Sequence, residues 1–143
     1  DTACVLPPAS LWDERIDQAR AGGTGAAVDA TLERWFTAPY RESGNPEVEK
    51  IGVMIRGTDV EGFAGCAAAI RDMDQTDLLA SIDTDTLVVV GEHDPGTPVS
   101  AAKVLHENIP GSELVVIDAS AHLCNIEQPA AFNQALLGFL KNR

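Results

Sequence analysis

The chain has few basic residues for its length. Its 143 residues include 10 Lys and Arg against 22 Asp and Glu, which gives a formal net charge of −12 at pH 7. Nucleic-acid phosphates and anionic membrane surfaces both attract proteins through clustered Lys and Arg. The composition therefore argues against a nucleic-acid partner and against a membrane partner, and it indicates a solvated acidic exterior.

Paired cysteines and long apolar runs are also missing. Cys4, Cys66 and Cys124 lie far apart and form no C-x-x-C motif, so the sequence predicts neither a zinc site nor a redox motif. We expect free thiols in a reducing compartment. No apolar run approaches the length of a membrane span and no signal peptide is recognised, so we expect a soluble, cytoplasmic protein.

A nucleophile motif is absent from these residues as well. An activated serine on a strained strand-to-helix turn is found in the pattern G-x-S-x-G. None of the six serines matches that pattern: Ser10, Ser43, Ser81, Ser100, Ser112 and Ser120. No HGGG-type segment is present to build an oxyanion hole. Chemistry that depends on such a serine therefore needs residues from outside this sequence.

The first half of the sequence contains helical patterns. Between residues 9 and 73, four amphipathic stretches follow one another, each with a start or stop signal. The predicted N-caps are Ser10, Thr24, Asn45 and Thr58. Gly22-Gly23 is predicted to end the first helix and Pro39 the second. We therefore expect four consecutive helices, followed by a short helical turn at DLLASID.

Beyond residue 84 the hydrophobic pattern becomes strand-like. DTLVVVGEHD (85–94) and SELVVIDASAH (112–122) each contain a β-branched run typical of strands buried on both faces. An amphipathic helix is predicted between them at 99–111, and a closing helix at 128–143. This order predicts two parallel strands joined by a right-handed crossover. Two such strands cannot close a sheet alone, so we expect them to belong to a larger layered α/β fold.

Two polar residues follow the predicted strands directly. Asp94 comes at the carboxyl end of the first strand and His122 just beyond the second. Taken singly, Asp94 is an ordinary turn residue before Pro95, and His122 is an ordinary loop histidine. However, adjacent parallel strands lie about 4.8 Å apart and sites form at their carboxyl ends. The pair matches the last two members of a Ser…Asp…His order, so we predict Asp94 as triad acid and His122 as triad base.

The other two histidines are interpreted as non-catalytic. His93 precedes the predicted acid, where its side chain can point the other way, and His106 lies in the middle of a predicted helix among polar neighbours.

Several segments resemble one known family. GEHDPGTP (91–98) and DASAHLCNIEQPAAFNQALLGFL (118–140) resemble the C-terminal part of the 3-oxoadipate enol-lactonases, which are α/β-hydrolases. LWDERI (11–16), LERWFTAPYR (32–41) and GFAGCAAAIRDMD (62–74) are similar to the helical cap of that family. HLCNIEQP and ERWFT are specific motifs, whereas GEHDPGTP alone indicates only an α/β-hydrolase. The resemblance covers essentially the whole chain.

The resemblance implies a fold and a domain order. The fold class is α/β, the C-terminal portion of an α/β-hydrolase in which a helical cap precedes the last two parallel strands and their helices. Residues 1–8 would be the end of a core strand and a loop, 9–75 the cap, and 76–143 the C-terminal core segment. The earlier strands, the nucleophilic serine and the oxyanion hole would lie on an N-terminal α/β-hydrolase segment, in the same or a separate polypeptide.

The resemblance also implies an activity and its site residues. The reaction is hydrolysis of 3-oxoadipate enol-lactone to 3-oxoadipate, in the breakdown of aromatic compounds, with Asp94 as triad acid and His122 as triad base. No metal or organic cofactor is implied.

The cap should offer a cation to the substrate, because the implied lactone is a small molecule with a free carboxylate. Arg34 is our candidate, since an arginine fork suits a carboxylate, and Trp35 is a second candidate beside it. A solvated helix face for Arg34 and packing in the cap core for Trp35 are the alternatives. Successive helical residues point about 100° apart, so both can face a site only across a wide helix face.

Two other functions are compatible with the residues. The chain could belong to another α/β-hydrolase, such as a carboxylesterase, which substrate profiling would separate from a lactonase. It could also be a non-catalytic fragment or a binding module. A stable monomer in which Asp94 and His122 lie apart would favour that last interpretation.

Overall fold

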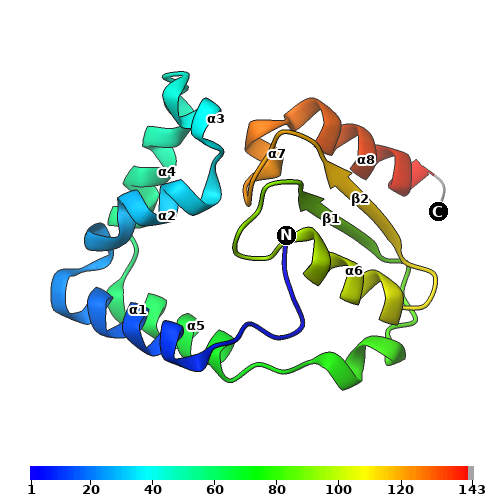
Figure 1. Ribbon diagram of the computed structural model, residues 1–143, viewed down its shortest axis with the longest axis horizontal. Helices are drawn as coiled ribbons and strands as arrows, with labels where there is room; N and C mark the ends of the chain where they lie inside the picture. The colour runs from blue at the N-terminus through cyan, green and yellow to red at the C-terminus, as the bar shows by residue number, and fades with distance from the viewer. Residues whose placement is uncertain (142–143) are drawn as a thin grey trace.

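The first group of elements is helical. The computed structural model describes residues 1–141 of the chain. The cap consists of α1 (Ala9–Gly22), the 3-10 turn η1 (Thr24–Ala27), α2 (Val28–Trp35), α3 (Ala38–Glu42), α4 (Pro46–Arg56) and α5 (Val60–Arg71). α1 and α5 lie side by side (Figure 1). Their contact is built on Ile16, Ala64 and Ala67, because the small alanines of α5 let the two helices approach closely.

One predicted stop signal and one predicted cap agree with the structure. α1 ends at Gly22, and Gly23 takes φ 75°, a conformation that suits glycine. Asn45 caps α4, and its side chain accepts a hydrogen bond from the Glu47 amide. Pro39 does not end a helix, contrary to the prediction. It lies in the first turn of α3, where proline is tolerated because its missing N–H is not needed.

Three of the predicted N-caps are wrong. Ser10 lies inside the first turn of α1. Thr24 begins η1, and its hydroxyl donates instead to the carbonyl of Thr58 at 3.1 Å. Thr58 is displaced as a cap by Asp59, which enters α5 in an extended conformation and accepts from the Gly62 amide at 2.7 Å. Sequence spacing could not separate these neighbours, because each is a good capping residue.

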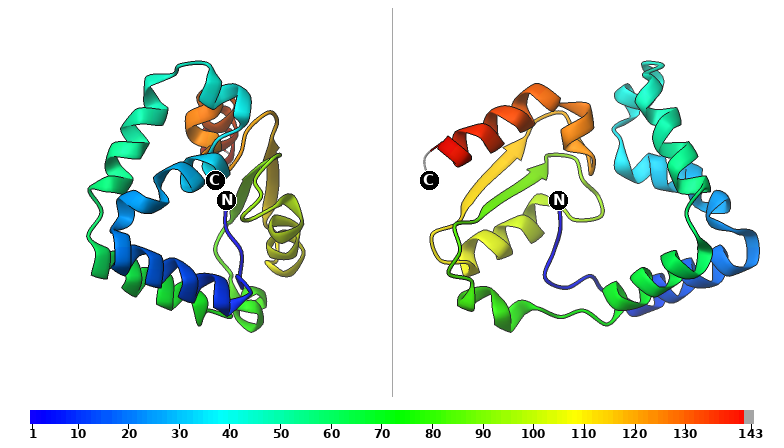
Figure 2. Two further views of the ribbon diagram at one scale, coloured as in Figure 1. Left: turned by 60° about the vertical axis from the view of Figure 1, so that its left-hand side comes forward. Right: turned by 180° about the vertical axis from the view of Figure 1, so that it is seen from behind.

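The second group of elements contains the sheet. It consists of the 3-10 turn η2 (Thr76–Ser81), β1 (Leu87–Gly91), α6 (Val99–Asn108), β2 (Glu113–Ile117), α7 (Cys124–Glu127) and α8 (Pro129–Lys141). β1 and β2 are parallel neighbours in register, which confirms the predicted pairing and crossover helix. α6 and α8 cover opposite faces of the sheet (Figure 2). The last two residues of the predicted closing helix, Asn142 and Arg143, lie outside the described residues.

The core of this group lies between β1 and α6. Val88 and Val90 of β1 pack on Ala102 and Leu105 of α6, and Leu79 closes the cluster from η2. The prediction that the second strand is buried on both faces is wrong for the described chain. Its central residues are only partly covered, and Val116 is exposed.

The side of the sheet toward α8 is thinly packed. Among the described residues, α8 has none that is buried, and its Leu137 and Leu140 are more than half exposed. A two-stranded sheet offers too little area to cover an apolar helix, which is the physical reason that parallel strands occur in larger layered folds.

The segment before α1 is extended but forms no strand. Val5 makes one isolated antiparallel bridge with Asp74. The backbone carbonyl of Cys4 accepts a hydrogen bond from the Gln75 amide at 2.9 Å. These contacts tie the start of the chain to the end of the cap. The division at residues 8 and 75 stays a prediction.

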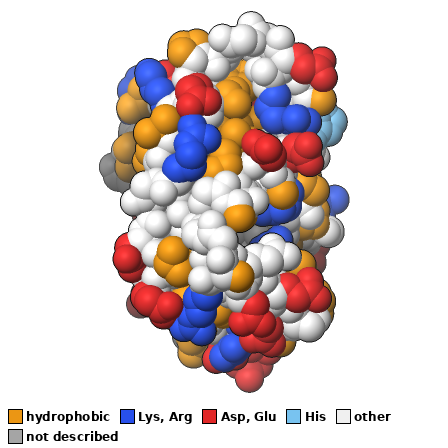
Figure 3. Space-filling view, turned by 90° about the vertical axis from the view of Figure 1, so that its left-hand side faces the viewer, with side chains coloured by type: hydrophobic (Ala, Val, Ile, Leu, Met, Phe, Trp, Pro, Cys, Tyr) orange, Lys and Arg blue, Asp and Glu red, His pale blue; other side chains and the backbone are white. Residues whose placement is uncertain are grey.

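The outer face of the cap is mixed in character. Hydrophobic side chains reach this surface between groups of acidic and basic ones (Figure 3). Exposed hydrophobic residues of the cap include Val53 and Met54 of α4. Arg20 and Glu61 form one of the exposed ion pairs, which contribute little to stability. Within residues 1–141, no helix combines the length and hydrophobicity that a membrane crossing needs.

Candidate active site

The structure brings Asp94 and His122 into direct contact. Asp94 lies three residues beyond the end of β1, and His122 lies in the loop that joins β2 to α7. Nδ1 of His122 is 2.7 Å from Oδ2 of Asp94. The Asp94 side chain is almost fully buried and the His122 side chain is 29% exposed. The carboxylate is therefore shielded from water while one edge of the imidazole remains reachable.

The Asp94 carboxylate is held by a tight turn after β1. Oδ1 accepts hydrogen bonds from the amides of Gly96 at 2.8 Å and Thr97 at 3.1 Å. Oδ2 accepts from the hydroxyl of Thr97 at 2.7 Å as well as from His122. The sequence reasoning missed Thr97, although an Asp followed three residues later by Thr is a signal for such a side-chain turn.

Hydrogen bonding decides the charge of Asp94. Burial by itself raises the pKa of this carboxyl, but the hydrogen bonds from His122, Thr97 and Gly96 outweigh burial and hold the pKa well below its ordinary value. The group is therefore ionised at neutral pH and can only accept hydrogen bonds. Nδ1 of His122 must then carry the proton, which leaves Nε2 as the basic nitrogen of the neutral ring.

We expect acid to destabilise the protein through Asp94. Because the folded state lowers the pKa of this carboxyl below about 3.9, the unfolded chain takes up the proton first. The stabilisation is complete above the unfolded pKa and is lost as pH falls through the folded pKa. Urea unfolding between about pH 6 and pH 2 should show this loss, on the order of 2 kcal/mol, in the parent and not in Asp94→Asn.

A matched control for this measurement is Asp118→Asn. Asp118 is an exposed carboxylate in the turn after β2. The Asp118→Asn variant should keep the pH dependence of the parent. If Asp94→Asn also kept that dependence in full, the assigned role of the Asp94 carboxylate in acid stability would be wrong.

The two predicted binding residues line the same cavity as the Asp–His pair. This cavity, of about 780 Å³, lies between the cap and the loops after β1 and β2, and Arg34, Trp35, Asp94 and His122 are all in its wall. The Trp35 and His122 rings stack with centroids 5.9 Å apart and an interplanar angle of 29°. α2 thus presents two successive side chains to one cavity, although their roles stay predictions.

A second arginine in this wall was missed by the sequence reasoning. Arg15 of α1 lines the cavity, and its guanidinium lies 4.6 Å from the centre of the Trp12 ring. Burial, and then the positive charge of Arg34, lower the pKa of Arg15. Among residues 1–141, neither Arg15 nor Arg34 forms an ion pair with a carboxylate. The sequence signal that could have paired Arg15 with Trp12 is their spacing, because residues at i and i+3 of a helix are neighbours.

The same corner contains a group of possible metal ligands. Single donor atoms of Asp1, Asp94 and His122 lie within 4.8 Å of one another. The carboxylate of Asp1 accepts from the Gly91 amide at 2.9 Å, and Asp94 is bonded to His122. A cation bound through Nδ1 of His122 would have to replace the Asp94–His122 hydrogen bond.

The remaining histidines make contacts away from this pair. His93 is exposed, with its Nε2 3.4 Å from a carboxylate oxygen of Glu92. His106 of α6 shares a hydrogen bond of 3.0 Å with Ser112.

Comparison with known proteins agrees with this arrangement. A family profile described as TAP-like protein, of the α/β-hydrolase type, matches residues 57–143. The chain is 34% identical over 141 residues to 3-oxoadipate enol-lactonase 2 of Acinetobacter baylyi, covering 99% of this chain and 52% of that protein. The chain thus spans about half the length of the curated relatives it matches.

Solved structures show the same fold. The enol-lactonase from Burkholderia xenovorans LB400 superposes with a TM-score of 0.94 at 32% identity, over 98% of this chain and 54% of that one. A hydrolase from Pseudomonas aeruginosa PA01 gives a TM-score of 0.92 at 36% identity, over 97% and 52%. The predicted resemblance and the predicted fold class are both confirmed. The chain belongs to the α/β-hydrolases, in the family of TAP-like proteins, and corresponds to the C-terminal half of their fold.

Proposed function

We propose that this chain supplies the cap and the acid–base pair of a serine hydrolase that opens 3-oxoadipate enol-lactone. The observation that carries the proposal is the Asp94–His122 hydrogen bond in the wall of a cavity that also holds two unpaired arginines. The similarity to enol-lactonases supports the choice of substrate. The nucleophilic serine and the oxyanion hole come from an N-terminal α/β-hydrolase segment.

The proposed mechanism uses Nε2 of His122 twice. Nε2 takes the proton from the serine hydroxyl as the serine oxygen attacks the lactone carbonyl, and Asp94 stabilises the imidazolium that forms. The ring C–O bond then breaks, and the imidazolium protonates the enolate oxygen, which leaves as an enol and becomes a ketone. A water molecule, deprotonated by Nε2, attacks the acyl-enzyme, and the released serine oxygen takes back the proton. The product is 3-oxoadipate.

The arginines give the cavity its proposed selectivity for an anion. A buried or half-buried guanidinium without a carboxylate partner is costly, and a bound carboxylate would offset that cost. Arg34 is held by a hydrogen bond of 3.1 Å to the hydroxyl of Thr31, which leaves other N–H groups of its fork for a ligand. We assign it to the free carboxylate of the lactone, and Trp35 to the wall beside the reacting ring.

The test is an assay on the whole protein in which this chain occurs. Enol-lactone hydrolysis by the purified protein, together with intact mass analysis, identifies whether a segment with a G-x-S-x-G serine accompanies the chain. A kcat/KM for the lactone far above that for simple neutral esters supports the proposal. Equal kcat/KM values for both substrate types would favour a carboxylesterase, and binding without turnover would favour a non-catalytic module.

Arg34→Gln should weaken hydrolysis of substrates that carry a carboxylate. Loss of charge-assisted hydrogen bonds costs about 1.5–3 kcal/mol, so we expect kcat/KM for the lactone to fall about 10- to 100-fold. For neutral esters kcat/KM should change little. The matched control is Arg20→Gln on the exposed face of α1, where Arg20 pairs with Glu61. A uniform loss for charged and neutral substrates would contradict carboxylate recognition by Arg34.

A further inference from the structure

One buried carboxylate outside the Asp–His pair has an unusual set of partners. Glu127, at the end of α7, is only 7% exposed. Its Oε1 accepts hydrogen bonds from the amide of Thr37 at 2.9 Å and from the Thr37 hydroxyl at 2.7 Å. Its Oε2 accepts from the amide of Ala121. One side chain thus joins the α2–α3 connection of the cap to the loop that carries His122.

The partners of Glu127 flank the candidate site on both sides. Ala121 directly precedes His122, and Thr37 is two residues beyond Trp35, whose ring stacks on His122. A second link runs from the amide of Leu123 to the carbonyl of Trp35 at 3.0 Å. The backbone on either side of His122 is therefore fastened to the cap, on one side through Glu127 and on the other through Trp35.

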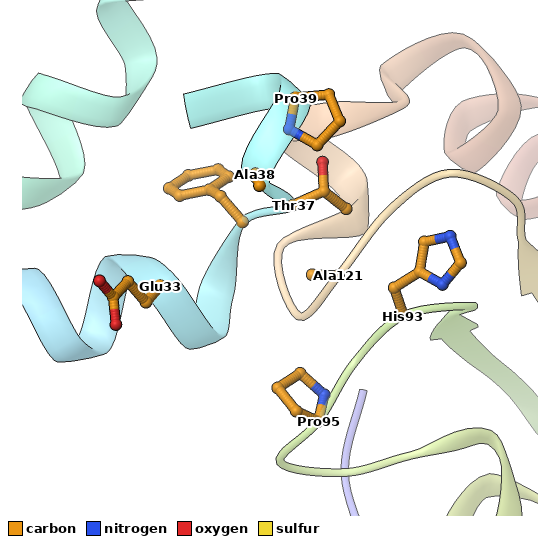
Figure 4. A pocket seen from close by; sticks show the side chains of 8 residues that line it. Glu33, Thr37, Ala38, Pro39, His93, Pro95 and Ala121 are labelled. Atoms are coloured by element: carbon orange, nitrogen blue, oxygen red, sulfur yellow. The ribbon is translucent and has the colours of Figure 1, made fainter. Parts of the chain in front are cut away.

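We call the contact that Glu127 makes between Thr37 and Ala121 the junction. A groove beside it leaves the junction accessible from one side. Thr37 lies opposite Ala121, and His93 and Pro95 complete the wall of a groove of about 320 Å³ (Figure 4). A further bond from the Tyr40 hydroxyl to the carbonyl of Ile126, at 3.3 Å, extends the contact between α3 and α7. Polar bonds thus cross the contact between the cap and the His122 loop, beside a groove that Phe36, Pro39 and Pro95 also line.

The chemistry of the junction requires a carboxylate. Three donors converge on Glu127, two on one oxygen and one on the other, and within residues 1–141 no Lys or Arg pairs with it. Burying an unpaired charge is expensive, and here charge-assisted hydrogen bonds are what offset the cost. A glutamine offers one carbonyl oxygen, and its NH₂ group would face a donor on one of the two sides. Glutamine can therefore satisfy one segment but not both.

We propose that Glu127 is a positioning residue that holds His122 in register with the cap. The inference rests on the proposed function, in which His122 is the base. By fixing the Ala121 amide to Thr37, Glu127 sets the distance between the imidazole and Trp35 and keeps Nδ1 aimed at Asp94. The cap thereby controls the geometry of the base without Glu127 touching the substrate.

The test uses Glu127→Gln in the whole protein, with Glu61→Gln as matched control. Glu61 is an exposed carboxylate whose partner is Arg20 on the cap surface. NMR of ¹⁵N-labelled protein follows the ring nitrogens of His122 and the exchange of the Ala121 and Leu123 amides. We expect the His122 ring signals to shift and both amides to exchange about tenfold faster or more in Glu127→Gln only.

Kinetics provide the second readout. A displaced base slows the chemical step more than it weakens substrate binding, so kcat should fall about 10- to 100-fold while KM changes little. Thr37→Val removes the hydroxyl that donates to Glu127 and that also accepts from the Tyr40 amide at the start of α3. It should give a smaller shift in the same direction, because the Thr37 amide still donates to Glu127. It keeps the inference testable if Glu127→Gln fails to fold.

The outcomes separate this inference from the proposed function. Folded Glu127→Gln with unchanged His122 signals and unchanged Ala121 exchange would overturn the positioning role, even if the variant melted at a lower temperature. If the parent protein showed no lactone hydrolysis, the proposed function would fail, while the NMR signals would still decide whether Glu127 positions His122.

Discussion

Replacing His122 by alanine is expected to lower kcat for the enol-lactone by about 10⁴- to 10⁶-fold, the scale of losing the base of a catalytic triad. Among the described side chains that line the cavity and bond to the Asp94 carboxylate, the His122 imidazole can accept a proton, whereas the Thr97 hydroxyl donates one. Without it, no imidazole among the described residues bonds to Asp94 to take the proton of the proposed serine. The measurement is single-turnover hydrolysis by parent and variant protein at matched concentrations.

Two other histidines serve as controls for this prediction. His93→Ala and His106→Ala should each keep kcat within a few-fold of the parent, because neither side chain contacts Asp94. Circular dichroism should show that all three variants are folded. Retention of kcat within about tenfold in His122→Ala would remove His122 from the mechanism and, with it, the assignment of Asp94 as its acid.

Gly91→Ala is expected to give the largest loss of stability of any glycine-to-alanine change in the chain. A Cβ atom at Gly91 would lie 2.1 Å from the carbonyl oxygen of Ala121 and 2.8 Å from that of Ser120. Both obstacles are backbone atoms, so no side chain can rotate away. We expect the free energy of unfolding to fall by about 3 kcal/mol or more, because the loop must move as a whole.

The same displacement should reach the candidate site. The obstructed loop carries His122, so Gly91→Ala should also lower hydrolysis in whatever fraction remains folded. Gly65→Ala is the matched control, since a Cβ at Gly65 in α5 meets no atom within 4 Å, and helical alanine should raise stability by about 0.5–1 kcal/mol. Urea unfolding measures both changes. Equal stability of Gly91→Ala and the parent would contradict the close packing of β1 on the His122 loop.

The Asp–His pair could be predicted because it depends on local order. A β-branched run followed by a polar residue, repeated after one helix, places Asp94 and His122 at the same edge of a parallel sheet. The contact was then a consequence of the pairing of β1 with β2. Arg34 and Trp35 came from a resemblance, and their positions on the cavity depended on how α2 packs, which helical periodicity alone left open.

Apart from Thr97, which lies three residues from Asp94, the residues that sequence reasoning missed make their contacts at the site with residues far away in the chain. Glu127 meets Thr37 across 90 residues, and Arg15 shares a cavity with His122 although each lies on a different group of elements. No periodicity encodes such pairs, because the encounter is set by how the cap docks on the sheet. The N-caps failed for a smaller reason, since neighbouring Ser, Thr and Asp residues compete for the same position.

The sequence by itself determined the α/β class, the parallel pair of strands and the places of Asp94 and His122 after them, because hydrophobic periodicity and strand–helix alternation are local properties of the chain. Only the tertiary structure decided which side chains surround His122. The stacking of Trp35 on His122 and the bridge made by Glu127 arise when the cap and the sheet meet. That meeting buries charges, and buried charges must find specific hydrogen-bond partners wherever the fold places them.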